Sequence, residues 1–119
     1  MTLLVHTFVR EADGSRRFLD DPDYARTMAG FESTRDRLWG AEAARALGAR
    51  FLPRLDGGDL CVEHEEIADF LAECENLRPY LPRLATEGGY RSDYVAERFA
   101  DIVTAALRAR TEGGGIIVW

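Results

Sequence analysis

Two apolar, β-prone segments lie near the two ends of this 119-residue chain, and helix-like segments fill the stretch between them. Both faces of a strand at 3–9 are mainly apolar, which is typical of a well-covered strand. Residues 116–119 read Ile-Ile-Val-Trp, so we expect them to form a strand that pairs beside 3–9. This predicts an α/β or α+β two-layer sandwich. Its small sheet has the N-terminal and C-terminal strands paired, with helices packed on it, and residues 1–119 form a single globular domain.

Apolar spacing predicts two long helical regions in the second half of the chain. Between residues 67 and 84, apolar side chains recur every three or four positions as one stripe. Pro79 and Pro82 should kink or break that helix near Arg78. Ser92 or Asp93 should cap a last helix, which should stop at the three glycines that follow residue 112.

The first half of the chain has a weaker pattern. A turn at 12–15 predicts a short returning strand at 16–19. The run Asp20-Asp21-Pro22-Asp23 is typical of a helix start, so residues 24–47 are expected to be mostly helical. Residues 50–55 and 60–62 are candidate strands, and the sequence leaves open whether 50–62 form a hairpin.

Negative charge is concentrated in residues 55–77, which hold eight of the 21 acidic side chains and no Arg or Lys. The net charge is −6, but outside this segment the chain has 13 acidic and 15 basic residues. Like charges four residues apart on a helix, as at Glu65, Asp69 and Glu73, cost about 0.2–0.5 kcal/mol per pair. This acidic face is solvated, paired with arginines from other elements, or bound by a basic partner, a metal or a cationic ligand. The eight are Asp56, Asp59, Glu63, Glu65, Glu66, Asp69, Glu73 and Glu75.

An exposed acidic helix favours a basic protein partner, because complementary charge speeds encounter and sets orientation. We predict a small acidic interaction protein that presents this helix to such a partner, with Trp39 or Tyr80 as an aromatic anchor. At the level of class, it is similar to immunity proteins and antitoxins that cap basic nuclease active sites. The predicted partner-binding residues are Asp59, Glu65, Glu66, Asp69 and Glu73.

No catalytic signature is as distinctive, so the sequence favours a binding protein over an enzyme and predicts no catalytic residue, cofactor or metal site. The chain has no Lys, which excludes Schiff-base and P-loop chemistry. His64 opens a fragment of the zinc-protease motif, but Ala68 occupies the second ligand position. The alternative is a small enzyme or ligand-binding domain whose sheet–helix pocket uses His6 or His64 with a carboxylate. Cys61, three residues before His64, is a further candidate nucleophile.

Location and remaining partners follow from composition. The apolar runs are far shorter than the roughly 20 residues that span a bilayer, and the N-terminal residues show no signal peptide, so we expect a cytoplasmic protein that binds no membrane. Two cysteines make no disulfide framework. With a pI near 4.9, the protein should repel nucleic acid. A homodimer through residues 116–119 is a third hypothesis, if that strand lies at a sheet edge.

Overall fold

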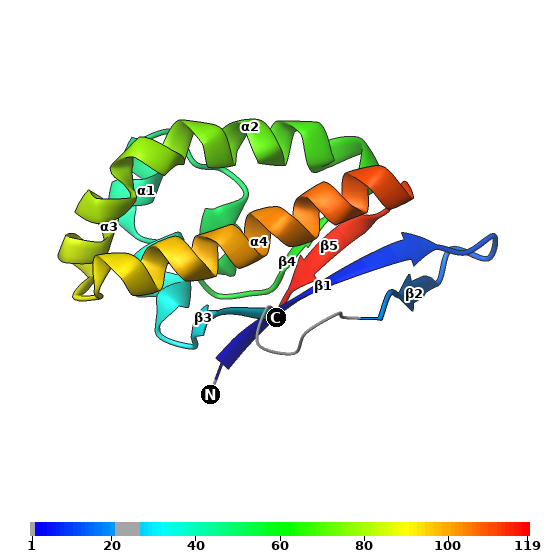
Figure 1. The fold of residues 1–119 in the computed structure, drawn as a ribbon, viewed down its shortest axis with the longest axis horizontal. Helices are drawn as coiled ribbons and strands as arrows, with labels where there is room; N and C mark the ends of the chain where they lie inside the picture. The colour runs from blue at the N-terminus through cyan, green and yellow to red at the C-terminus, as the bar shows by residue number, and fades with distance from the viewer. Residues whose placement is uncertain (1, 21–26) are drawn as a thin grey trace.

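The structure, a computed structural model, describes residues 2–20 and 27–119. It is an α+β two-layer sandwich, in which an antiparallel sheet of five strands carries helices on one face (Figure 1). The strands are β1 (Thr2–Arg10), β2 (Arg16–Phe18), β3 (Met28–Phe31), β4 (Leu60–Val62) and β5 (Gly115–Val118). The α-helices are α1 (Glu42–Ala46), α2 (Ile67–Leu77), α3 (Leu81–Gly88) and α4 (Ser92–Glu112). Short π- or 3-10-helical segments are η2 (Arg35–Trp39), η3 (Leu52–Leu55), η4 (His64–Glu66) and η5 (Arg78–Tyr80).

The N-terminal and C-terminal strands pair, as the sequence predicts. β5 runs antiparallel to β1, with Val118 opposite Val5, and also antiparallel to β4. β2 and β3 pair with different halves of β1. Because β5 has a neighbour on each side, residues 115–118 do not form a sheet edge. Dimerisation by edge pairing of this strand is therefore ruled out, since its backbone groups already bond to β1 and β4.

One hydrophobic core fills the space between the sheet and helices α2 and α4 (Figure 1). Side chains alternate between the two faces of a strand, so every second residue of β1 and β5 enters this core. Phe70 of α2 and Phe99 of α4 meet them from the helical layer, each at most 1% exposed. The strand residues of the core include Leu3, Val5, Leu60, Val62, Ile116 and Val118.

The opposite face of the sheet, which we call the outer face, has no α-helix over it among the described residues (Figure 1). Strand register defines it, because directly opposed residues of neighbouring strands lie on the same face. Phe8 is opposite Phe18, and Ile117 lies between His6 and Cys61. Phe8 is fully buried on this face, although it does not belong to the main core.

Two predictions in the first half of the chain are wrong. Residues 28–31 form strand β3 instead of a helix, and Gly30 has a φ of +131°, which no helical residue adopts. Residues 52–55 form a 3-10 turn instead of part of a strand, with Pro53 in its first turn, and residues 50–62 therefore form no hairpin. The helix start predicted at 21–23 lies outside the described residues.

The predicted interruption near Arg78 is confirmed, because α2 gives way to the 3-10 turn η5 at that residue. The predicted cap of the last helix is wrong: α4 begins at Ser92 with Arg91 at the N-cap position, so neither Ser92 nor Asp93 is its cap. Gly113 ends α4 with a φ of +74°, a conformation that favours glycine. None of the described helices combines the length and hydropathy needed to cross a bilayer.

Candidate functional site

Arginines contact most of the acidic segment. Five of its eight carboxylates form ion pairs, four of them with arginines from β1, η2, α1 and η3. These pairs are partly exposed, so each contributes about 0–1 kcal/mol to stability. Together they neutralise a charge that looked unbalanced in the sequence. The pairs are Arg45–Asp56 (3.2 Å), Arg35–Asp59 (3.2 Å), Arg10–Glu63, Arg54–Glu66 (3.9 Å) and Arg78–Glu75 (2.8 Å).

Glu73 has a structural role, and the expectation that it lies on an exposed helix side is wrong. Its side chain is buried, with the residue 8% exposed, and its carboxylate accepts hydrogen bonds from the backbone N–H groups of Arg50, Phe51 and Leu52. These donors begin the 3-10 turn η3 and have no partners within it. Glu73 therefore fixes the loop at 50–52 against α2 and is not available to a partner.

Three of the five predicted partner-binding residues, Glu65, Asp69 and Glu73, have no ion pair among the described residues, and of these three only Glu65 and Asp69 are exposed. Asp59 pairs with Arg35, and Glu66 accepts the backbone N–H of Glu63 as part of a capping box. The structure thus reduces the predicted acidic surface to two carboxylates near the start of α2.

The predicted aromatic anchors also differ from each other. Trp39 is 1% exposed and donates from Nε1 to the carbonyl of Ala29 at 2.9 Å, so it belongs to the core and is no anchor. Tyr80 is 42% exposed on η5.

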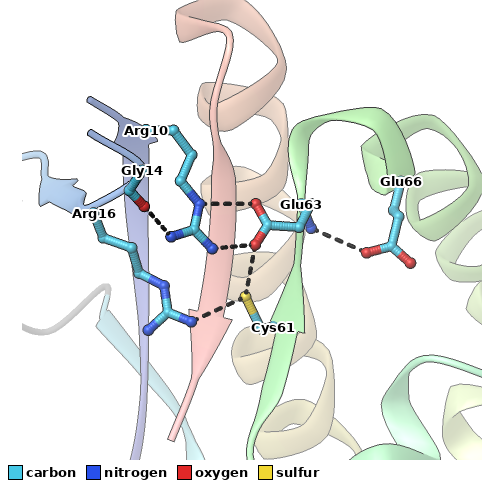
Figure 2. A network of polar contacts seen from close by, with 6 residues as sticks. All are labelled: Arg10, Gly14, Arg16, Cys61, Glu63 and Glu66. Carbon is cyan, nitrogen blue, oxygen red and sulfur yellow. Dashed lines mark hydrogen bonds and ion pairs between the residues drawn. The ribbon is translucent and has the colours of Figure 1, made fainter. Parts of the chain in front are cut away.

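One end of the outer face carries a polar network that includes Arg10, Arg16 and Glu63 (Figure 2). The guanidinium carbons of Arg10 and Arg16 lie 5.3 and 5.4 Å from the centre of the Phe8 ring. Arg10 donates to both carboxylate oxygens of Glu63 and, at 2.8 Å, to the carbonyl of Gly14. These contacts hold two cations and one anion over a buried ring, and we call this group the closed end.

Cys61 joins the closed end through its sulfur atom (Figure 2). Arg16 donates to Sγ at 3.6 Å, and the thiol donates to Oε1 of Glu63 at 3.7 Å. Burial, followed by the negative charge of Glu63, raises the pKa of this thiol above its ordinary value. In turn, the hydrogen bond from Arg10 lowers the pKa of Glu63. The thiol is therefore mainly protonated at neutral pH, which disfavours a nucleophilic role.

His64 contacts a different group. Its Nδ1 lies 3.2 Å from the carbonyl oxygen of Gly114, and no hydrogen bond among the described residues joins it to Cys61. His64 and Glu65 line a cavity of about 560 Å³ at the end of the sheet, together with Arg10 and Glu63 of the closed end. Cys61 and His64 therefore do not form the thiol–imidazole pair that their spacing of three residues allows.

The other end of the outer face exposes aromatic rings, and we call it the open end. Phe18 and Trp119 stack with ring centres 5.7 Å apart and an interplanar angle of 27°, and each is 42% exposed. The imidazole of His6 contacts both rings edge-on, at 6.0 and 6.2 Å. With Leu19 and Asp20, these three residues line a cleft of about 350 Å³.

A sequence signal for the open end existed but is weak. Strand alternation places His6, Phe8 and Phe18 on one face only when the β1–β2 register is known. The contact with Trp119 joins segments more than 100 residues apart, and period-2 patterning does not report such contacts. Sequence patterns alone therefore do not identify Phe18 and Trp119 as surface residues.

Among residues 2–20 and 27–119, no three His, Cys, Asp or Glu side chains converge in a way that could hold a metal ion. Comparison with known proteins found no matching family model, no matching curated protein and no matching solved structure. The function therefore has to be inferred from the geometry of this chain.

Proposed function

We propose that this protein binds a basic protein partner, and that the open end of the outer face is the centre of the binding surface. The observation that carries the proposal is the stacked pair of Phe18 and Trp119, each 42% exposed on a sheet face that no described helix covers. Exposed aromatic side chains are costly to leave in water, and tryptophan is enriched among the residues that dominate binding energy.

The charge of the protein supports a basic partner. The net charge is −6, and the carboxylates without an ion pair in the described residues include Asp20, Glu65 and Asp69. Opposite charge raises association rates and orients the approach of a partner. In this proposal the acidic helix keeps a smaller role than the sequence suggests, through Glu65 and Asp69 only.

The test is capture of the partner from the native host with matched variants. Tyr80 is as exposed as Trp119, 42%, but lies on η5, so Tyr80→Ala controls for the loss of an exposed ring. We expect a basic protein that wild type and Tyr80→Ala retain, Trp119→Ala loses, and cross-linking maps to the outer face. Equal capture by all three proteins would contradict the proposal.

The contribution of the acidic helix has its own test. Glu65→Gln with Asp69→Asn should slow association and flatten its dependence on salt, because these carboxylates steer the encounter. Stability should be equal or slightly higher, since neither residue has an ion pair to lose. An association rate unchanged at low salt would remove these residues from the binding surface.

An immunity-protein or antitoxin role is a specific form of this proposal, in which the basic partner is a nuclease. We also propose a cytoplasmic location. It is supported by Cys61 and Cys74, which are both free thiols in the structure. Inhibition of the captured partner by the purified protein would support the nuclease form, and an uninhibited partner would reject it.

A ligand-binding or catalytic function is the second candidate, and the cavity of about 560 Å³ favours it. His64 there has its Nδ1 beside the carbonyl of Gly114 and lies near the unpaired Glu65, so Nε2 and a carboxylate are available for acid–base chemistry. A small-compound screen by NMR would test it. Compounds that shift the His64 imidazole resonances in wild type but do not bind His64→Ala would support it, and a screen without hits would reject it.

A further inference from the structure

The arginines of this chain repeatedly contact aromatic rings, and the two ends of the outer face differ in this respect. Six guanidinium groups of the described residues lie within 6.0 Å of a ring centre. Two of them contact Phe8 at the closed end, from Arg10 and Arg16. Within the described part of the chain, none contacts Phe18 or Trp119, whose rings are stacked only 5.7 Å apart. Among the described residues, the rings of the open end therefore lack the guanidinium contacts that Phe8 has.

The open end also carries a negative charge suited to a cation. Asp20 lines the same cleft of about 350 Å³ as Phe18 and Trp119, is exposed, and has no ion pair with the described arginines. Aromatic faces are electrostatically negative and attract cations within about 6 Å of the ring centre. The aromatic pair and the carboxylate of Asp20 are thus each complementary to a positively charged group.

We infer that this cleft binds the guanidinium group of an arginine on the basic partner, an inference that rests on the function proposed above. Guanidinium is planar and weakly hydrated, so it stacks on aromatic faces and can bond a carboxylate bidentately, which a compact ammonium cannot do. The closed end shows the same chemistry within one chain, because Arg10 lies over Phe8 and donates to both oxygens of Glu63. At the open end, Trp119 and Phe18 take the place of Phe8, and Asp20 takes the place of Glu63.

NMR titration with single amino-acid derivatives tests this chemistry without a known partner. The probes are the N-acetyl amides of arginine, of lysine, and of citrulline, which keeps the shape of arginine without the charge. We expect arginine to shift the Trp119 indole and Phe18 ring resonances saturably at millimolar concentrations. The indole of Trp39 is buried and bonded to Ala29, so it should not move and is an internal reference.

The relative affinities of the arginine, lysine and citrulline derivatives decide whether the cleft binds guanidinium. Citrulline should bind about five-fold more weakly than arginine or not measurably, given the strength of cation–aromatic contacts at exposed sites. Lysine should fall between them. Equal responses to arginine and citrulline would overturn the inference, and equal responses to arginine and lysine would overturn its assignment to guanidinium.

Two variants at separate parts of the cleft keep the test independent of folding. Trp119→Leu removes a ring, and Asp20→Asn removes only the charge from an exposed residue. Each should weaken arginine binding about three-fold or more. Asp36→Asn is the control, because Asp36 is also exposed and pairs with no described arginine, but lies on η2. Arginine binding that survives both cleft variants would overturn the inference.

The two proposals can fail separately. If capture of the partner depends on Trp119 but arginine and citrulline bind alike, the protein-binding function stands and the guanidinium assignment falls. If arginine binds as expected but no partner is lost with Trp119→Ala, the cleft has the inferred chemistry and the proposed function falls.

Discussion

The closed and open ends of the outer face are built from the same kinds of side chain, but they differ in their contacts with arginine. At the closed end, arginines of the chain contact both the aromatic ring and the carboxylate. At the closed end, Phe8 is fully buried beneath two guanidinium groups. At the open end, Phe18 and Trp119 are each 42% exposed beside Asp20, which has no ion pair in the described part of the chain. Both ends join aromatic rings to an acid, and among residues 2–20 and 27–119 arginines contact the rings of the closed end only. The difference indicates that the closed end stabilises the fold, whereas the open end is available for binding.

The largest effect that would separate the two ends is on stability. Phe8→Ala should lower the free energy of unfolding by about 3–5 kcal/mol, because it removes a fully buried ring and leaves a cavity. Phe18→Ala should cost about 1 kcal/mol, because nearly half of the ring is already in water. Urea unfolding monitored by circular dichroism measures both. Similar losses for the two variants would mean that the open end is also structural.

The loss of partner affinity should have the opposite order, with the larger loss for a substitution at the open end. Once the partner is isolated, Trp119→Ala should weaken its affinity about 10- to 30-fold, which corresponds to a central residue of an interface. Arg16→Gln at the closed end should change affinity less than about two-fold, because its guanidinium is engaged with Phe8 and Cys61. Isothermal titration calorimetry gives both values. A greater loss with Arg16→Gln would place the interface at the closed end.

The ion pair of the closed end predicts a pH dependence of stability. Because Arg10 lowers the pKa of Glu63 in the folded state, the pair stabilises the protein above the ordinary value of 4.5, and this contribution is lost as the pH falls through the folded pKa. Glu63→Gln should therefore cost about 0.5–1 kcal/mol at pH 7 and progressively less below about pH 4.5.

Unfolding by urea at several pH values measures this difference, and Glu112→Gln is the control because Glu112 is exposed on α4 without an ion pair. A constant difference between wild type and Glu63→Gln across the pH range would show that the pair does not couple to folding.

The smallest expected effect concerns the reactivity of Cys61. Glu63 raises the pKa of this thiol and Arg16 lowers it, so Glu63→Gln should speed alkylation by iodoacetamide at pH 8, and Arg16→Gln should slow it. We expect changes of about two- to five-fold, with a matching shift of the pH–rate profile. Cys74 is buried, with its pKa raised to about 12, and should react only after unfolding. Rates that change without a shift of the pH profile would indicate altered access only.

The elements that the sequence predicts correctly are those with a local signal. The strand at residues 2–10, the break at Pro79 and the helix stop at Gly113 depend on alternation, proline and glycine within a few residues. Strand β3 carries no such signal, because Gly30 does not favour a strand by itself. The strand forms through pairing with β1, which the local sequence does not reveal. Residues 50–52 likewise depend on the distant carboxylate of Glu73.

The candidate site was harder to predict for a related reason. The acidic run at 55–77 looks unbalanced in sequence because four of its five arginine partners come from other elements, such as Arg10 and Arg35. Whether a charge is free therefore depends on tertiary structure, and so does the exposure of Trp119. The residue types show which acidic and aromatic groups the chain has. The register of β1 with β2 and β5 determines which of the aromatic groups gather on the outer face.

The position of β5 also affects how this protein forms during synthesis. β4 bonds to the rest of the sheet through β5, which lies between it and β1. While the ribosome is still making residues 1–114, β1 and β4 have unpaired backbone edges, and the core side chains of β5 are missing. Such late closure is typical of slow folding with transient exposure of aggregation-prone strands. A nascent chain should therefore stay incompletely folded, and dependent on chaperones, until residues 115–118 leave the exit tunnel.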